Sequence, residues 1–264
     1  MLRRTVLAAV TLGALVLSGL SAMAQSQPPL KIGVSAGPYG DILRFTADLA
    51  AKEGLKAEIV EFSDWVQINE ALNRGDLDAN NFQHIPYLQN QVKQRGYDIV
   101  PLDASIVVPM GLYSKKFKSA ADLPKGAQVA IPNDPSNASR ALFLLQQAGL
   151  IKLKADAPLN ATLIDIAENP RGIKLIELDA AQLPRSLDDV AAATVTLNYA
   201  VLAGLKPKES ITLENEQSKW HLVWAARKDR KDDPRIKRFI ALYRSQPVKD
   251  FINARFEGTI IPTW

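Results

Sequence analysis

Strand-like and helix-like segments alternate along most of this chain, and the alternation constrains the fold more than any other feature. Residues 30–37 and 56–62 have the pattern of buried strands, and residues 40–55 and 66–76 have helical spacing of apolar residues. A second series of this kind begins near residue 107. Such alternation is typical of parallel sheets with helices on both faces. It predicts two α/β units, and a single doubly wound domain is the alternative.

Two such units, with the last segments returning to the first, predict a two-lobed receptor. We expect one lobe at residues 30–108 plus 226–264 and the other at 109–225. Residues 161–166 and 173–179 are expected as paired strands of the second lobe. A ligand would then bind between the lobes, at the carboxyl ends of the strands.

The first 24 residues have the layout of a cleaved signal peptide. A basic start is followed by an apolar run over residues 5–20 and by small residues before Gln25. The alternative, a lone membrane anchor, fits less well because the run is short and no basic flank follows it. The chain has no Cys, so we expect neither a disulfide nor a thiol for lipid attachment. The sequence thus predicts a periplasmic protein without a lipid anchor.

Several functional classes receive no support from the sequence. The formal charge of +4, without a long basic run, argues against nucleic-acid binding. Nucleophile, zinc-protease and nucleotide-binding motifs are missing, and Asp188 with Asp189 is more typical of a solvated first helical turn. With His84 and His221 as the only histidines, no metal-ligand set can be assembled. We therefore expect no catalytic residue, no metal and no cofactor.

The stretch "NDPSNASR", residues 133–140, is the most informative polar segment. It follows a strand and opens a helix, with Ser136 or Asn137 as the expected cap. Free N–H groups gather at such a helix start, and Arg140 could donate two hydrogen bonds to a carboxylate. From residue types alone, a simple cap and a surface charge are the favoured interpretation.

Aromatic residues cluster in "FQHIPY", residues 82–87. Phe82 and His84 are two apart, so they share one face of a strand end, and Tyr87 follows one helical turn later. With Trp65 they could form an aromatic box for an apolar side chain. Ordinary core packing is the alternative.

These motifs together resemble the methionine-binding proteins of ABC importers, the NlpA lipoprotein family. The resemblance covers nearly all of the chain after the leader. It rests on "FSDWVQINEALNRGDLDANNFQHIPYL", "IPNDPSNASRALFLLQQAGLIKL", "ENP" followed by "LIELDAAQLPRSLDD", and "NYA".

The resemblance implies a two-lobed periplasmic binding protein fold, expected as a monomer, that closes on methionine and delivers it to an inner-membrane ABC permease. It implies a side-chain pocket and a head-group site, with Asn198 as the matching polar residue on a later strand. The implied ligand-binding residues are Trp65, Phe82, His84, Tyr87, Asn137, Arg140, Asn198 and Trp220.

Two departures from the family pattern affect these expectations. The family usually carries a lipid-accepting Cys after its leader, which this sequence lacks. The family's S-P-Y-x-N segment reads "SKWHL" here, so Trp220 matches the Tyr and Leu222 matches a ligand-contacting Asn. Losing that amide costs roughly 1–3 kcal/mol if a polar ligand atom is left unpaired. The ligand could then be another amino acid, a short peptide, or a small carboxylate or sulfonate.

Three functions follow as hypotheses. The first is a periplasmic substrate-binding protein for methionine or a related amino acid, without enzyme activity. The second is an envelope enzyme that acts on an amino-acid-like substrate with His84 as general base. The third is a scaffold or adhesion module with an empty groove.

Overall fold

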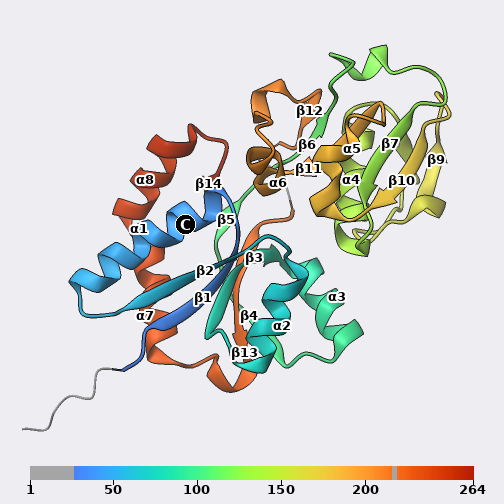
Figure 1. The fold of residues 1–264 in the computed structure, drawn as a ribbon. Coiled ribbons are helices and arrows are strands. Elements are labelled where there is room, and N and C mark those ends of the chain that lie inside the picture. Colours follow the sequence, from blue (N-terminus) through green and yellow to red (C-terminus); the bar gives the residue numbers. More distant parts are fainter. Residues whose placement is uncertain (1–26, 216–218) are drawn as a thin grey trace, which may run out of the picture.

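The computed structural model describes residues 27–215 and 219–264, and it arranges them as two α/β lobes (Figure 1). Each lobe is built on its own five-stranded sheet. The predicted two-lobed α/β fold is therefore confirmed. The predicted signal peptide at residues 1–24 lies outside the described residues.

The first sheet has the strand order β2-β1-β3-β13-β4. Its strands are β1 (Leu30–Ser35), β2 (Ala57–Phe62), β3 (Ala79–His84), β4 (Ile99–Ala104) and β13 (Leu222–Arg227). Strands β2, β1 and β3 are parallel, as the alternation predicts. Strand β13 is antiparallel to both of its neighbours because it enters this lobe from the other one.

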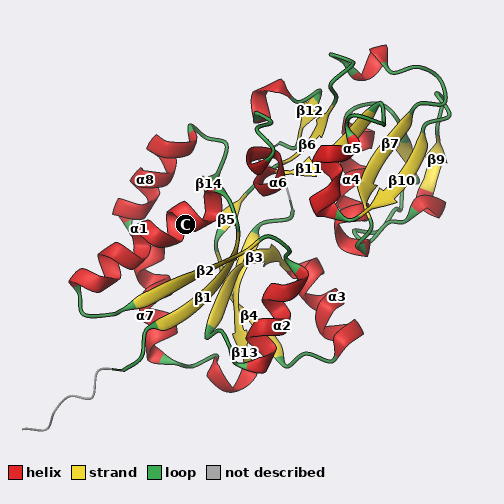
Figure 2. Ribbon diagram, in the orientation of Figure 1, coloured by secondary structure: helices red, strands yellow, loops and turns green. Residues whose placement is uncertain are grey.

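Helices cover both faces of the first sheet (Figure 2). The helices are α1 (Pro38–Lys52), α2 (Val66–Arg74), α3 (Ile85–Arg95), α7 (Pro234–Tyr243) and α8 (Gln246–Phe256). Helices α1, α7 and α8 share one core with Trp224 of β13, and α2 and α3 contribute to a separate core with Phe82. Trp224 is fully buried, with ring centroids 5.9 Å from Phe239 and 5.1 Å from Tyr243.

The second sheet has the strand order β10-β7-β11-β6-β12. Its strands are β6 (Met110–Tyr113), β7 (Gln128–Pro132), β10 (Lys174–Leu178), β11 (Ala192–Thr196) and β12 (Thr212–Leu213). The accompanying helices are α4 (Pro135–Gln147), α5 (Leu183–Ser186) and α6 (Leu197–Leu202). Helix α4 shares a core with β6 and β7, whereas α5 and α6 pack in a separate cluster with β11.

Residues 161–166 differ from the sequence-based expectation. Leu163–Asp165 forms a 3-10 turn, and β9 (Ile166–Glu168) pairs with β8 (Lys152–Leu153) outside the main sheet. Residues 161–166 and 173–179 are therefore not paired strands, since β10 pairs in parallel with β7. Asp165 accepts hydrogen bonds from the backbone and hydroxyl of Thr162, so local capping outcompetes an extended conformation.

The chain passes between the lobes twice, from β4 to β6 and from β12 to β13. Strand β5 (Ile106–Val107) lies in the first passage and pairs with β14 (Ile261–Pro262). Thr263 donates both its N–H, at 3.1 Å, and its hydroxyl, at 2.7 Å, to the carbonyl of Ser105. The last residues of the chain are therefore attached to the first passage.

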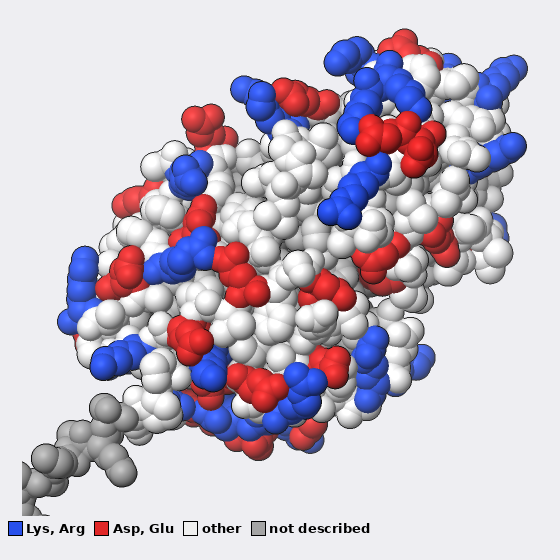
Figure 3. All heavy atoms as spheres, in the orientation of Figure 1, with Lys and Arg blue, Asp and Glu red and all other residues white. Residues whose placement is uncertain are grey.

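Positive and negative side chains are interspersed over both lobes on the face drawn in Figure 3. Uncharged atoms predominate near the middle of this face. Within the described residues, no helix has the length and apolar character needed to cross a membrane.

Candidate functional site

A narrow cavity lies where the two lobes meet, and only about 20 Å³ within it is free for a water-sized molecule. This is room for about one water molecule, so the lining side chains of the two lobes are packed closely together in this structure. It is lined by Tyr39, Trp65, Phe82, Gln83, His84, Tyr87, Val108, Asn137, Arg140, Thr196, Asn198 and Leu222. Strands β3 and β11 end at this cavity, so it occupies the position that open α/β sheets commonly use for ligands.

Seven of the eight sequence-predicted binding residues line this cavity. Trp65, Phe82, His84 and Tyr87 come from the first lobe, and Asn137, Arg140 and Asn198 come from the second. Trp220 is the exception. It is buried, its ring centroid lies 5.8 Å from that of Phe143, and it lines a separate hollow.

The rings of the first lobe form one wall of the cavity. The Tyr87 ring centroid lies 5.9 Å from Trp65 and 6.0 Å from Phe82, both in tilted or edge arrangements. Trp65 also approaches Tyr199 of the second lobe, at 5.1 Å. Such a wall can surround an apolar side chain and strengthen dispersion contacts with it.

His84 ends β3 and caps α3. Its Nδ1 accepts the Tyr87 backbone N–H at 3.1 Å, so the proton of the neutral ring lies on Nε2. Nε2 then donates to Asn137 Oδ1 of the second lobe, also at 3.1 Å. Both ring nitrogens are therefore engaged, and one of the two bonds connects the lobes.

Burial lowers the pKa of His84 to about 3, and the positive charge of Arg140 contributes in the same direction. The imidazole is consequently neutral at physiological pH. A general base needs an accessible nitrogen with a pKa near the working pH. The hypothesis that His84 is the base of an envelope enzyme gains no support from this geometry.

The pH dependence of stability should reveal the buried imidazole. An unfolded His has a pKa near 6.5, so the unfolded chain binds a proton below that pH while folded His84 does not. The contribution of neutral His84 to the free energy of unfolding is thus fully present above about pH 6.5. It falls by about 1.4 kcal/mol per pH unit as the pH is lowered from 6.5 toward 3. Urea unfolding at several pH values should show this slope, and His84→Asn should lose that component.

An NMR titration of the His84 ring supplies the direct check. We expect no change in its ionisation between pH 8 and pH 5. A midpoint near pH 6.5 would contradict the burial argument.

The start of α4 differs from the expected capping. Asp134, rather than Ser136 or Asn137, is the N-cap, and it accepts the Asn137 N–H at 2.9 Å. It also accepts a bond of 3.0 Å from Asn137 Nδ2. A carboxylate is the better cap here because it accepts hydrogen bonds from several donors at once. Its negative charge is also stabilised by the positive end of the helix dipole. Asn137 Oδ1 is thereby directed toward His84 rather than toward its own helix.

Arg140 is almost fully buried, with its side chain 2% exposed, so the surface-charge interpretation is wrong. Its Nη2 donates to the carbonyl of Val108 at 2.6 Å. Its Nε lies 3.1 Å from both carboxylate oxygens of Glu214, and Nη2 also donates to Glu214. Nη1 takes part in none of these bonds, and Arg140 also lines the cavity.

Two further donors belong to residues that line the cavity. Asn198 Nδ2 and the Tyr87 hydroxyl are buried without a hydrogen-bond partner among the described residues. Asn198 Oδ1 accepts from the Thr196 hydroxyl at 3.0 Å, which fixes the orientation of the amide. Unpaired buried donors are costly, so these groups favour a ligand that supplies acceptor oxygens.

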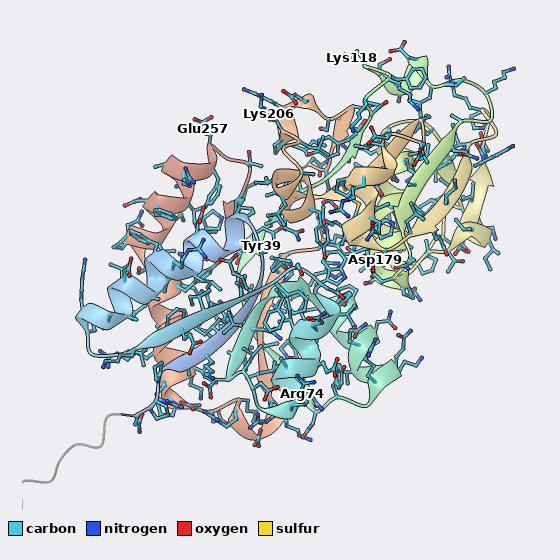
Figure 4. The ribbon with its side chains drawn as sticks, in the orientation of Figure 1. Tyr39, Arg74, Lys118, Asp179, Lys206 and Glu257 are labelled. Atoms are coloured by element: carbon cyan, nitrogen blue, oxygen red, sulfur yellow. The ribbon has the colours of Figure 1, made fainter. Side chains whose placement is uncertain are left out.

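Four lining residues were not predicted: Tyr39, Gln83, Val108 and Thr196. Leu222, which matches the family's ligand-contacting Asn, also lines the cavity. Tyr39 lies on the first turn of α1, at the junction of the lobes (Figure 4). Gly37, two residues before Tyr39 and two residues after the end of β1, has a positive φ of 112°, and such a glycine shortly after a strand was the available signal. Gln83 also bonds Asn69 at 2.7 Å in a buried amide network, a contact that sequence spacing does not indicate.

Metal ions are common in enzyme sites, where side chains of the protein hold them in place. The described residues contain no group of three or more His, Cys, Asp or Glu side chains placed to hold a metal ion. What the cavity offers is an aromatic wall from the first lobe, with the Tyr87 hydroxyl as a buried donor in it, and hydrogen-bonding side chains from the second lobe.

Known proteins resemble this chain over most of its length. The model of the NlpA lipoprotein family matches residues 30–264. The D-methionine-binding lipoprotein MetQ of Yersinia pestis is 43% identical over 257 residues, covering 96% of this chain and 95% of the relative.

Solved structures give the same result. A nutrient-binding protein from Burkholderia cenocepacia, bound to methionine, is 50% identical with a TM-score of 0.84. The match covers 89% of this chain and 100% of that one. The methionine-binding protein MetQ is 44% identical with a TM-score of 0.85, and the match covers 89% and 98% of the two chains.

These names correct one expectation. The prediction of a periplasmic protein without a lipid anchor is wrong, because the matching family and the relative from Yersinia pestis are both named lipoproteins. The expectation that no lipid is attached rested only on the lack of Cys in the sequence. A missing residue type is weaker evidence on membrane attachment than membership of a lipoprotein family.

Proposed function

Because this chain belongs to the NlpA lipoprotein family, we propose that it is the periplasmic substrate-binding component of an ABC importer. The ligand that we propose is methionine or a closely related amino acid. The observation that carries this proposal is the cavity between the lobes, which combines an aromatic wall with buried donors.

The two kinds of lining suggest how the ligand is oriented. We place its carboxylate near Arg140 Nη1 and Asn198 Nδ2, which are donors on the second lobe. Its apolar tail would lie among Trp65, Phe82 and Tyr87. A bound ligand would then contact both lobes at once and stabilise the closed form over the open one.

Leu222 bears on which amino acid is preferred. It begins β13 and lines the cavity, so an apolar side chain stands where the family pattern has an amide. Fewer polar partners and more apolar surface favour a ligand with a large apolar side chain. We therefore keep related amino acids beside methionine in the proposal.

The lobe boundaries are part of the same proposal. We assign residues 30–108 plus the returning C-terminal segment to one lobe and the intervening residues to the other. Because Leu222 pairs with His84 and Val223 with Ala104, the pairing favours starting the returning segment at 222 rather than 226. Bonds such as Tyr199 hydroxyl to the Ser63 carbonyl, 3.3 Å, would then form between lobes on closure.

An inner-membrane permease is the proposed partner, and a monomer is the expected state. The permease would respond to the closed shape, since only that shape brings the two lobes into a fixed relation. This mechanism requires no covalent step.

A ligand panel tests the proposal directly. We expect calorimetry with L-methionine and D-methionine, followed by the other amino acids, to give one site per chain and no chemical product. A new product from any candidate would support the envelope enzyme instead. Absence of a thermal shift across the whole panel would support the scaffold module.

A further inference from the structure

A buried carboxylate lies behind the guanidinium of Arg140. Glu214 follows β12, and its side chain is 8% exposed against 2% for Arg140. Both of its oxygens lie 3.1 Å from Arg140 Nε. Glu214 is absent from the cavity lining and instead lines the separate hollow that contains Trp220. The guanidinium therefore separates Glu214 from the ligand cavity.

This arrangement fixes the direction in which Arg140 points. Nε faces Glu214, Nη2 is shared between Glu214 and the Val108 carbonyl, and the Trp220 ring centroid lies 5.9 Å from Cζ. Because a guanidinium is planar and rigid, fixing Nε and Nη2 also fixes Nη1.

The carboxylate also changes the charge that a ligand encounters. A buried ion pair has no net charge, so a ligand carboxylate is attracted by Arg140 and repelled by Glu214 behind it. The attraction is weaker than that of an uncompensated guanidinium. The pair thus reduces the preference of the site for anionic groups, and neither charge is left uncompensated in the ligand-free protein.

Glu214 is further connected to the passages between the lobes. Its Oε2 accepts the Met110 N–H at 3.1 Å, and Met110 begins the strand that follows the first passage. Glu214 itself begins the second passage. The carboxylate that pairs with Arg140 is therefore held in place at the second-lobe ends of both passages.

We infer that Glu214 is a positioning residue and counter-charge for Arg140, and that it sets how strongly the site prefers a carboxylate over a neutral group. The inference deepens the proposed function and rests on it for the ligand. The part of the inference that concerns the orientation of Arg140 does not depend on the proposed function.

Glu214→Gln is the decisive variant, because it removes the charge and keeps one acceptor oxygen. The quantity to measure is the Kd for methioninamide divided by the Kd for methionine. We expect this ratio to rise about tenfold, because the uncompensated guanidinium attracts the carboxylate more strongly and repels the cationic amide. Glu209→Gln is the matched control, since Glu209 is 55% exposed and pairs at the surface with Lys206. Its ratio should equal that of the wild type.

A ligand-free measurement separates this inference from the proposed function. By NMR, the Arg140 Nε–H should exchange slowly with solvent in the wild type and in Glu209→Gln, and faster in Glu214→Gln. A ratio within twofold of the wild type, or unchanged exchange in Glu214→Gln, overturns the inference. If the wild type binds neither methionine nor methioninamide, the proposed function and the ligand preference fail together, and the exchange result decides the positioning role.

Discussion

Arg140→Ala is expected to weaken binding of methionine by about 2 kcal/mol or more, roughly 30-fold in Kd. The proposed orientation gives this residue the ligand carboxylate, and a charge-assisted bond to a buried carboxylate has few substitutes. Calorimetry on the wild type and the variant measures the change directly. An unchanged affinity would rule out the assigned role.

The same variant should also lose stability. Removing Arg140 leaves Glu214 buried without its counter-charge and the Val108 carbonyl without its 2.6 Å donor. Breaking one half of a buried pair costs about 3–5 kcal/mol. Binding must therefore be measured at a temperature where the variant is folded, which circular dichroism establishes.

A double variant separates the two effects. Arg140→Met together with Glu214→Leu replaces the ion pair by apolar groups, which is often neutral for stability. We expect it to regain most of the lost stability and none of the lost affinity. If it regained the affinity as well, the loss in Arg140→Ala would be a folding effect only.

Trp224→Ala is expected to cost about 3–5 kcal/mol of unfolding free energy, because it empties the centre of the first lobe. Trp224 is fully buried in β13 between the rings of Phe239 and Tyr243. Equilibrium urea unfolding followed by circular dichroism measures the change. A loss below 1 kcal/mol would contradict the packing argument.

Two matched variants sharpen that test. Trp224→Phe should cost much less, because the Trp224 Nε1 is buried without a partner among the described residues and the ring volume is largely kept. Leu202→Ala, at a residue 55% exposed on α6, should stay within about 0.5 kcal/mol of the wild type.

The sequence was sufficient for the fold class because strand–helix alternation is a local pattern. It did not predict the antiparallel direction of β13, since that direction depends on the passage from the other lobe. It also misplaced residues 161–166, where Asp165 and Thr162 form a local cap. The first miss concerns a long-range connection, and the second concerns a local cap that replaces an extended conformation.

In the candidate site, too, local clusters could be predicted from the sequence and distant partners could not. The cluster of Phe82, His84 and Tyr87 spans six residues, and its meeting in one cavity followed from strand and helix geometry. The partner of Arg140 could not be found this way, because Glu214 is 74 residues further along the chain. The buried Trp220 lines the separate hollow beside Glu214 rather than the cavity, and the sequence did not predict this either.

The pairing of β14 with β5 has a practical consequence for anyone labelling this protein. Trp264 packs 5.2 Å from the Tyr243 ring, and its carbonyl accepts a bond of 2.7 Å from Lys249. We expect a bulky fusion appended after Trp264 to interfere with the β14–β5 pair, which lies in the first passage between the lobes. A small fluorophore at the same position would lie beside this passage and report changes in it when the lobes open or close.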